Sequence, residues 1–160
     1  MISDIVFGEM WEDAARRDFT INALYYDPAT EEIYDYHHGF EDLGKKRLRM
    51  IGNPEARYRE DPVRMIGAVR ISAKLGFAIE PATERPIARM AKLLSNVPSA
   101  RLVDEALKLL TCGHAVECVS RLRKEGLAEA VLPTLDRLLA TPGGEAFLLL
   151  ALRRTGERLA

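Results

Sequence analysis

Three charged residues stand immediately before an apolar segment near the start of the chain, in the sequence "RRDF" at 16–19. The guanidinium groups of Arg16 and Arg17 suit phosphate oxygens, which they can bind bidentately. The Asp18 carboxylate can accept hydrogen bonds from ribose hydroxyls or help to hold a metal ion. The same three residues would also form an ordinary surface ion pair, so the motif alone is only a hypothesis of anion binding.

A second charged motif, "REDPVR" at 59–64, has the groups needed to read a planar base. Asp61 and Arg64 are three positions apart, so we expect them on one face of the first turn of a helix. There the aspartate can accept a hydrogen bond from an exocyclic amine while the arginine donates to ring acceptors. The alternative is a helix N-cap followed by a first-turn ion pair.

The net charge of −1 conceals a strong asymmetry along the chain. Residues 1–44 carry eleven acidic and two basic side chains, whereas residues 45–74 carry nine basic and three acidic ones. A local basic block of this kind predicts an anionic partner, most often one with phosphates. A solvated surface without a partner is the alternative.

The elements that must position these charges change in type along the chain. Alternating residues predict a β-hairpin from strands at 19–27 and 33–39 joined by a turn at 28–32. A lone hairpin is marginal, so either helices cover it or the rest of its sheet lies outside this chain. From about residue 58 the pattern is helical, with a helix at 60–76 capped by Asp61, others at 81–96, 98–113 and 114–126, and two pieces separated by "TPGG" at 141–144.

Composition sets the class of protein. With 160 residues, 48% of them apolar, the chain is long enough for one full domain or two small ones. The longest apolar run, 146–152, is too short to cross a bilayer, and the first residues lack a leader pattern, so we expect a cytoplasmic protein. Cys112 and Cys118, with only His114 nearby, fall short of the four ligands of a zinc site and are predicted to be ordinary thiols.

Three stretches in order, "ARRDFTINALYYD" at 15–27, residues 34–65 and "AVRISAKLGFAIEPATERPI" at 68–87, resemble the class II nucleotidyltransferases. These are the bacterial poly(A) polymerases and the related tRNA CCA-adding enzymes. The resemblance covers about residues 5–140, and "IGNPEARYREDPVRM" at 51–65 favours the poly(A) polymerase branch. An unrelated helical interaction domain would require the three motifs to have arisen by chance.

The resemblance implies an α+β fold, in which the hairpin end of a nucleotidyltransferase head precedes an all-helical neck and body. The expected divisions are residues 1–54, 55–120 and 121–160. Arg17 and Asp18, supported by Arg16 and Asn22, would contact the triphosphate and ribose of a nucleotide, and Asp61 and Arg64, flanked by Glu60, would read its base. The implied RNA-binding residues are Lys45, Lys46, Arg47, Arg49, Arg57, Arg59, Arg70 and Lys74.

The family reaction is the attack of an RNA 3′-hydroxyl on the α-phosphate of ATP, assisted by two magnesium ions held on a D-x-D carboxylate pair. That pair and a Gly-Ser loop precede the RRDFTIN motif in the family, and neither is found before Ala15 here. Glu12 and Asp13 have a different spacing and are not assigned. We therefore expect a fragment with no catalytic or metal-binding residue, inactive alone and holding no cofactor tightly.

The expected partners are RNA and ATP, with neither DNA nor a membrane. Two alternatives remain open, a fragment of a CCA-adding enzyme or a stand-alone RNA-binding module. A further departure is Gly67 in "RMIGAVRI", where the family usually has an arginine. It lies three residues after Arg64, so its missing side chain is expected to remove a charge beside the nucleotide, and a mid-helix glycine costs about 0.5–1 kcal/mol relative to alanine.

Overall fold

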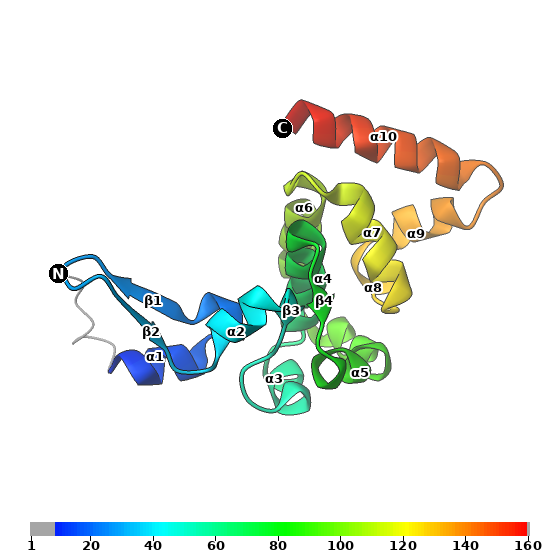
Figure 1. Ribbon diagram of the computed structural model, residues 1–160. Coiled ribbons are helices and arrows are strands. Elements are labelled where there is room, and N and C mark those ends of the chain that lie inside the picture. The colour runs from blue at the N-terminus through cyan, green and yellow to red at the C-terminus, as the bar shows by residue number, and fades with distance from the viewer. Residues whose placement is uncertain (1–8, 160) are drawn as a thin grey trace.

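The computed structural model describes residues 9–159, apart from the side chains at positions 134, 135 and 138. Its N-terminal part contains the predicted hairpin, formed by β1 (Leu24–Asp27) and β2 (Glu32–Asp35). The strands are antiparallel, with Leu24 opposite Asp35 and Asp27 opposite Glu32. Helix α1 (Met10–Arg16) lies beside the hairpin, which projects away from the helices that follow (Figure 1).

Both predicted strands are too long. The first is preceded by the 3-10 helix η2 (Thr20–Asn22), and Phe19 makes only an isolated bridge to Met50. The second ends at Asp35 because its carboxylate accepts hydrogen bonds from the N–H groups of Gly39 and Phe40 at 2.8 and 3.0 Å. These bonds cap α2 (Gly39–Gly44), so Gly39 begins a helix instead of ending a strand.

Gly39 is required by a close approach of two backbone segments. A Cβ atom at this position would lie 2.2 Å from the carbonyl oxygen of Thr20. The hydroxyl of Thr20 also donates to the Asp42 carboxylate on α2 at 2.7 Å, and both side chains are buried. Helix α2 is thereby held against the segment that follows the RRD motif.

A second strand pair, which the sequence did not predict, joins the N-terminal part to the helices. Strand β3 (Arg47–Leu48) pairs in parallel with β4 (Ala78–Ile79). Beside it, the hydroxyl of Thr83 accepts a hydrogen bond from Met50 N–H at 3.0 Å, and the buried Tyr58 donates to the Thr83 carbonyl at 2.7 Å. The two parts of the chain are therefore linked by backbone and side-chain hydrogen bonds as well as by the polypeptide itself.

The remainder is the predicted helical array, with three corrections. A separate helix, α3, precedes α4, so Asp61 ends α3 instead of capping α4, and Pro62 takes the capping position. The helix predicted at 81–96 divides into the α-helix α5 and the 3-10 helix η3. The last segment contains three helices instead of two. The elements are α3 (Pro54–Glu60), α4 (Val63–Leu75), α5 (Pro81–Met90), η3 (Ala91–Asn96), α6 (Ser99–Thr111), α7 (Ala115–Lys124), α8 (Ala128–Val131), α9 (Pro133–Leu139) and α10 (Gly144–Leu159).

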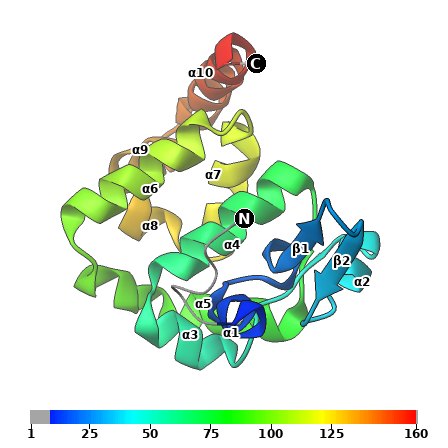
Figure 2. The same cartoon turned by 90° about the vertical axis from the view of Figure 1, so that its left-hand side faces the viewer.

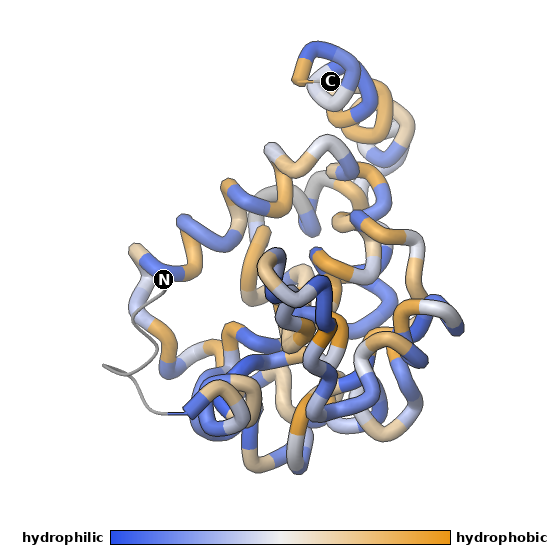
Figure 3. The backbone as a smooth tube through the Cα atoms, turned by 60° about the vertical axis from the view of Figure 1, so that its left-hand side comes forward, coloured by the Kyte–Doolittle hydropathy of each residue, from blue (hydrophilic) through white to orange (hydrophobic). Residues whose placement is uncertain are grey.

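Helix α4 is the centre of the core. Its residues Met65, Ile66, Ala68 and Val69 are fully buried, and it packs against α3, α6 and α7. Hydrophobic and hydrophilic residues alternate along the other helices, as expected when each turns one face to a shared interior (Figure 3). The predicted C-terminal stop at Gly76 is confirmed, since this residue adopts the left-handed conformation.

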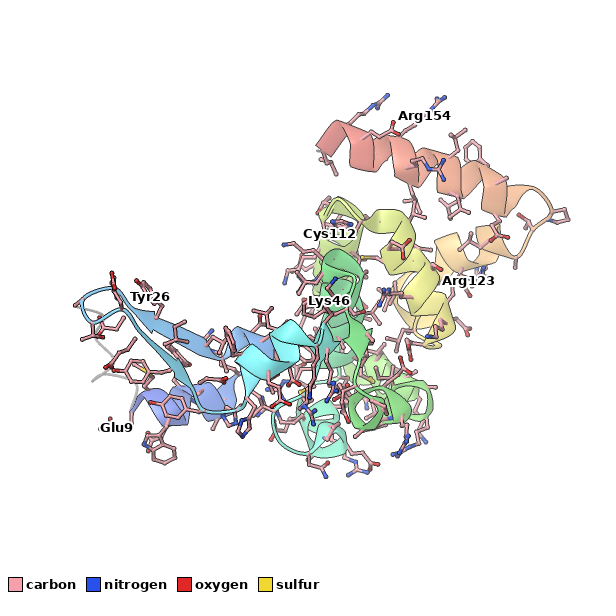
Figure 4. All side chains as sticks on the ribbon, viewed as in Figure 1. Glu9, Tyr26, Lys46, Cys112, Arg123 and Arg154 are labelled. Carbon is pink, nitrogen blue, oxygen red and sulfur yellow. The ribbon has the colours of Figure 1, made fainter. Side chains whose placement is uncertain are left out.

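The array does not cover the hairpin. Several large apolar side chains of the N-terminal part are exposed, namely Trp11, Tyr26, Ile33, Tyr36, Phe40 and Leu43. Tyr26 is labelled on the outlying hairpin in Figure 4. Within residues 9–159, no helix is long and apolar enough to cross a membrane.

The two cysteines lie close together at the junction of α6 and α7, where Cys112 is labelled in Figure 4. Both are free thiols, with their Sγ atoms 3.6 Å apart. Burial raises the pKa of the Cys118 thiol to about 12, so it remains protonated at neutral pH. Among the described residues, no three His, Cys, Asp or Glu side chains are grouped so that they could hold a metal ion.

Candidate functional site

The two charged motifs, about forty residues apart in sequence, line one open cavity of about 390 Å³. The loop after α1 contributes one wall, the junction of α3 and α4 another, and α6 a third. Figure 2 shows α1 beside α3, with α4 and α6 above them. The lining residues are Arg16, Arg17, Asp18, Asp61, Val63, Arg64, Gly67, Arg70 and Glu105.

Arg17 is oriented by a small polar cluster. Its guanidinium donates to the Asp13 carboxylate at 3.2 Å and lies 5.9 Å from the ring centroid of Tyr25. The Tyr25 hydroxyl donates to the same Asp13 oxygen at 2.5 Å, and this hydrogen bond lowers the pKa of Asp13. Because Asp13 is engaged by Arg17 and Tyr25, residues 12 and 13 do not fit a carboxylate pair for magnesium.

Asp18 is held by its own backbone and by Asn22. Its Oδ1 atom accepts from Phe19 N–H at 2.8 Å and from the Asn22 side-chain amide at 3.3 Å. Asn22 does not line the cavity, so it contacts the cavity only through Asp18. Five of the six predicted nucleotide-binding residues are thus brought together, and the sixth supports one of them.

Arg57 of α3 binds the backbone of residues 16–18, called here the RRD loop. Its Nη2 atom donates to the backbone carbonyls of Arg16, at 3.2 Å, and of Arg17. Its Nε atom is buried and has no hydrogen-bond partner within the described part of the chain, and burial lowers the pKa of the guanidinium, as does the nearby Arg64. The sequence placed Arg57 among the RNA-binding residues, whereas its guanidinium is used inside the molecule.

The Asp61–Arg64 pair arises at a break between helices and not within one helical turn. Asp61 has extended backbone angles, φ −149° and ψ 93°. Its Oδ2 atom accepts from the Arg101 guanidinium at 2.7 Å. Arg64, with only 22% of its side chain exposed, donates to Glu60 at 2.8 Å and to the Arg57 carbonyl at 3.0 Å.

Helix α4 forms the floor of the cavity. Gly67 is buried, and a Cβ atom there would meet nothing within 4 Å, so its missing side chain leaves open space. Arg70, three residues further along the same face, also lines the cavity, and its buried Nε atom has no partner among the described residues. Arg70 was predicted to bind RNA, and its position puts it beside the nucleotide motifs instead of on the outer surface.

Sequence reasoning missed the contribution of α6. Glu105 is buried, forms an ion pair with Lys108 at 3.0 Å and lines the cavity opposite α4. Its position was available in the pattern, because Glu105 shares the buried face of the helix with Leu102 and Leu109. Arg101 carried no comparable signal, since its partner lies forty residues earlier.

The remaining predicted RNA-binding residues lie outside the cavity. Lys45 and Arg49 pair with Glu41 and Asp42 of α2, at 2.5 and 3.1 Å. Lys46, labelled in Figure 4, is exposed between α2 and β3. The others are the half-buried Arg47, Arg59, which pairs with Glu55 at 3.5 Å, and the exposed Lys74.

Comparison with known families gives two matches along the chain. The poly(A) polymerase head domain matches residues 3–49, and the domain described as the probable RNA- and SrmB-binding site of polymerase A matches residues 76–139. Poly(A) polymerase I of Salmonella typhi is 49% identical over 146 residues, which are 91% of this chain and 31% of that protein.

Solved structures share the fold. The CCA-adding enzyme of Bacillus stearothermophilus, in complex with CTP, is 36% identical, with a TM-score of 0.74 over 82% of this chain and 34% of that one. A tRNA nucleotidyltransferase complexed with a primer tRNA and an incoming ATP analogue is 25% identical, with a TM-score of 0.73 over 91% of this chain and 49% of that one.

These matches identify the fold as that of part of a nucleotidyltransferase. More particularly, the chain belongs to the family of bacterial poly(A) polymerases and CCA-adding enzymes. It spans about a third of the length of the poly(A) polymerases that it matches.

Proposed function

We propose that the chain is part of a polynucleotide adenylyltransferase, which transfers AMP from ATP to RNA 3′ ends. The observation that carries this proposal is the meeting of the RRD loop and the Asp61–Arg64 pair at one cavity. The 49% identity to a poly(A) polymerase supports the adenylyltransferase branch. The cytoplasm, where ATP and RNA occur together, is the proposed location.

In this proposal the cavity binds a nucleotide lengthwise. Arg16 and Arg17 bind its phosphates, and Asp18 accepts hydrogen bonds from the ribose, using lone pairs that Phe19 N–H and Asn22 leave free. At the other end, Asp61 accepts from the exocyclic amine of the base and Arg64 donates to a ring nitrogen. Arg70 adds positive charge on the floor between the two ends.

Magnesium would supply the activation of the RNA hydroxyl and the stabilisation of charge on the phosphates. The described residues do not fit a site for it, because Asp13 is bonded to Arg17 and Tyr25. The role derived for this chain is therefore to grip and select the nucleotide. We also propose that residues 1–54 belong to the head, 55–120 to the neck and 121–160 to the body.

RNA is the proposed second partner. The exposed cations Lys45, Lys46, Arg59 and Lys74, with Arg47, provide a surface for its phosphates outside the cavity. The structural relative that is complexed with a primer tRNA supports a polynucleotide partner.

Transfer of both CMP and AMP to tRNA is a second candidate function. Adenine and cytosine both place an exocyclic amine next to a ring nitrogen, so an aspartate–arginine pair suits either base. The CTP-bound relative, with its TM-score of 0.74, favours keeping this candidate.

Equilibrium binding of the four labelled nucleoside triphosphates to the 160-residue chain tests the proposal. We expect ATP to bind more tightly than GTP and UTP, and the Arg64→Ala variant to lose this preference while its affinity for oligo(A) stays unchanged. Equal affinity for all four nucleotides in the wild-type chain would contradict the proposal. CTP binding as tight as that of ATP would favour the second candidate.

Primer extension with magnesium, oligo(A) or a tRNA lacking its 3′ CCA then measures catalysis. We expect no incorporation by this chain alone. Incorporation would show that metal-binding carboxylates had been overlooked, with Glu12 and Asp13 the first to be replaced.

A further inference from the structure

We propose that Arg101 is a positioning residue that fixes the Asp61 carboxylate and thereby sets the selectivity of the cavity for adenine and cytosine, which carry an amine where guanine and uracil carry a carbonyl oxygen. This inference rests on the proposed nucleotide-binding function and assigns a determinant of selectivity to α6, outside both sequence motifs. Arg101 itself does not line the cavity, so it acts through Asp61.

The need for such a residue follows from where Asp61 lies. The residue sits in the extended connection between α3 and α4, so no helical turn restricts its side chain. The bond from Val63 N–H to Oδ1 is long, at 3.4 Å, whereas the Arg101 Nη2 atom lies 2.7 Å from Oδ2. The strong contact that orients the carboxylate therefore comes from α6.

The geometry leaves Asp61 able to read a base. Each carboxylate oxygen has two lone pairs, and Arg101 and Val63 occupy one on each oxygen. The free lone pairs accept hydrogen bonds and cannot donate them, which suits the amine of adenine and opposes the carbonyl oxygen of guanine or uracil. A carboxylate free to rotate would enforce this difference less strictly, because alternative rotamers would reduce the mismatch.

This role is distinguishable from a contribution to stability. Both side chains are partly exposed, 50% for Arg101 and 26% for Asp61, and ion pairs of that kind typically contribute only about 0–1 kcal/mol to folding. Loss of Arg101 should therefore change selectivity much more than stability. The hydrogen bond to Asp61 raises the pKa of Arg101.

The chain offers a matched control in Arg89. This residue also joins two helices through an ion pair, with Glu55 of α3, and it is similarly exposed, but it does not line the cavity. Arg89→Ala therefore removes an interhelical ion pair without touching Asp61.

The experiment compares the affinities of the 160-residue chain for ATP and for ITP, which carries a carbonyl oxygen in place of the 6-amine. We expect Arg101→Ala to reduce the ATP-to-ITP preference about tenfold, within the range that a good base contact provides. Arg101→Lys should restore part of the preference, because lysine retains the charge but not the planar geometry. Arg89→Ala should leave it unchanged.

A double-mutant comparison tests whether Arg101 acts through Asp61. In an Asp61→Ala background, Arg101→Ala should produce no further change in the ratio of affinities. A wild-type preference for ATP that survives intact in Arg101→Ala would overturn the inference alone. Equal binding of ATP and ITP by the wild-type chain would overturn both the inference and the proposed reading of the base.

Discussion

The Arg57 guanidinium donates a hydrogen bond to the backbone carbonyl of Arg17, forty positions earlier in the chain. A second bond joins it to the Arg16 carbonyl. These bonds hold the backbone of residues 16 and 17 against α3, while the side chains of Arg16 and Arg17 line the cavity. One half-buried arginine therefore fixes the backbone that carries two others.

Removing this cation should weaken binding of the phosphates in particular. We expect Arg57→Ala to lower affinity for ATP about tenfold, consistent with the roughly 1.5 kcal/mol of a hydrogen bond to a charged group, and to leave affinity for adenosine nearly unchanged. Titration calorimetry with both ligands measures the difference. The neighbouring Arg59→Ala, which removes an exposed pair with Glu55, is the control. An equal loss of affinity for ATP and adenosine would contradict the role.

The basic residues around Lys45, Lys46 and Arg47 should bind RNA phosphates through their positive charge. Arg49 is best left in place, because its removal would leave the buried Asp42 without its cation. We expect Lys45→Ala, Lys46→Ala and Arg47→Ala together to weaken oligo(A) binding and to reduce the slope of log affinity against log salt by roughly 2. Filter binding at several salt concentrations measures this slope.

The control variant removes three positive charges from a different helix, α10. Arg153, Arg154 and Arg158 are exposed on α10, and their joint replacement by alanine should leave the slope unchanged. The RNA would have to lie on α10 if the second triple variant, and not the first, flattened the slope.

Gly67 should tolerate a side chain. Because a Cβ atom would meet no neighbour within 4 Å, Gly67→Ala should raise stability by about 0.5–1 kcal/mol through helix propensity alone. Urea denaturation measures the change. Gly76→Ala is the contrast, since Gly76 has a φ of +67° and alanine there should destabilise the chain. A loss of stability on Gly67→Ala would mean that the space beside α4 is closed.

Stability should fall as pH rises toward neutrality because of Glu125. Burial, and then a hydrogen bond shared with Glu84, raise the pKa of Glu125 to about 7 from its ordinary 4.5. The folded state therefore binds this proton more tightly than the unfolded state. Its contribution is fully present below pH 4.5 and is lost as the pH rises through about 7.

Glu125→Gln should remove this dependence and raise the denaturation midpoint at about pH 8. Urea midpoints measured from about pH 5 to pH 8 test it. The exposed Glu129→Gln should follow the wild-type curve. A parallel fall of midpoint in wild type and Glu125→Gln would assign the effect to other groups.

Local patterns predicted the elements, because hairpins and amphipathic helices depend on residues close in sequence. The stop at Gly76 and the hairpin turn are of this kind. The ends of elements were less predictable, since the strand ending at Asp35 ends through a cap formed by its own side chain. The break between α3 and α4 was not predicted, because Asp61 was interpreted as the N-cap of one long helix. In the structure Asp61 ends the preceding helix, α3.

The site was predictable in part for the same reason. Its motifs could be read from their residue types, and the cavity includes five of the six candidates. The residues that hold those motifs in position could not be found from residue types alone. Arg57 and Arg101 act on residues about forty positions away, and only the folded chain brings each pair together.

The parallel pairing of β3 with β4 has a mechanical consequence. Ala78 and Glu80 donate their backbone N–H groups to the carbonyls of Lys46 and Leu48, which ties the N-terminal part to the far end of α4. The loop that presents Arg17 and the junction that presents Asp61 are therefore expected to move as one rigid body, without a hinge between them. In a hydrogen-exchange measurement, the backbone amides of Ala78 and Glu80 should then become exposed together with those in the core of α4. The two ends of the cavity would keep a constant separation, which sets the length of the ligand that fits between them.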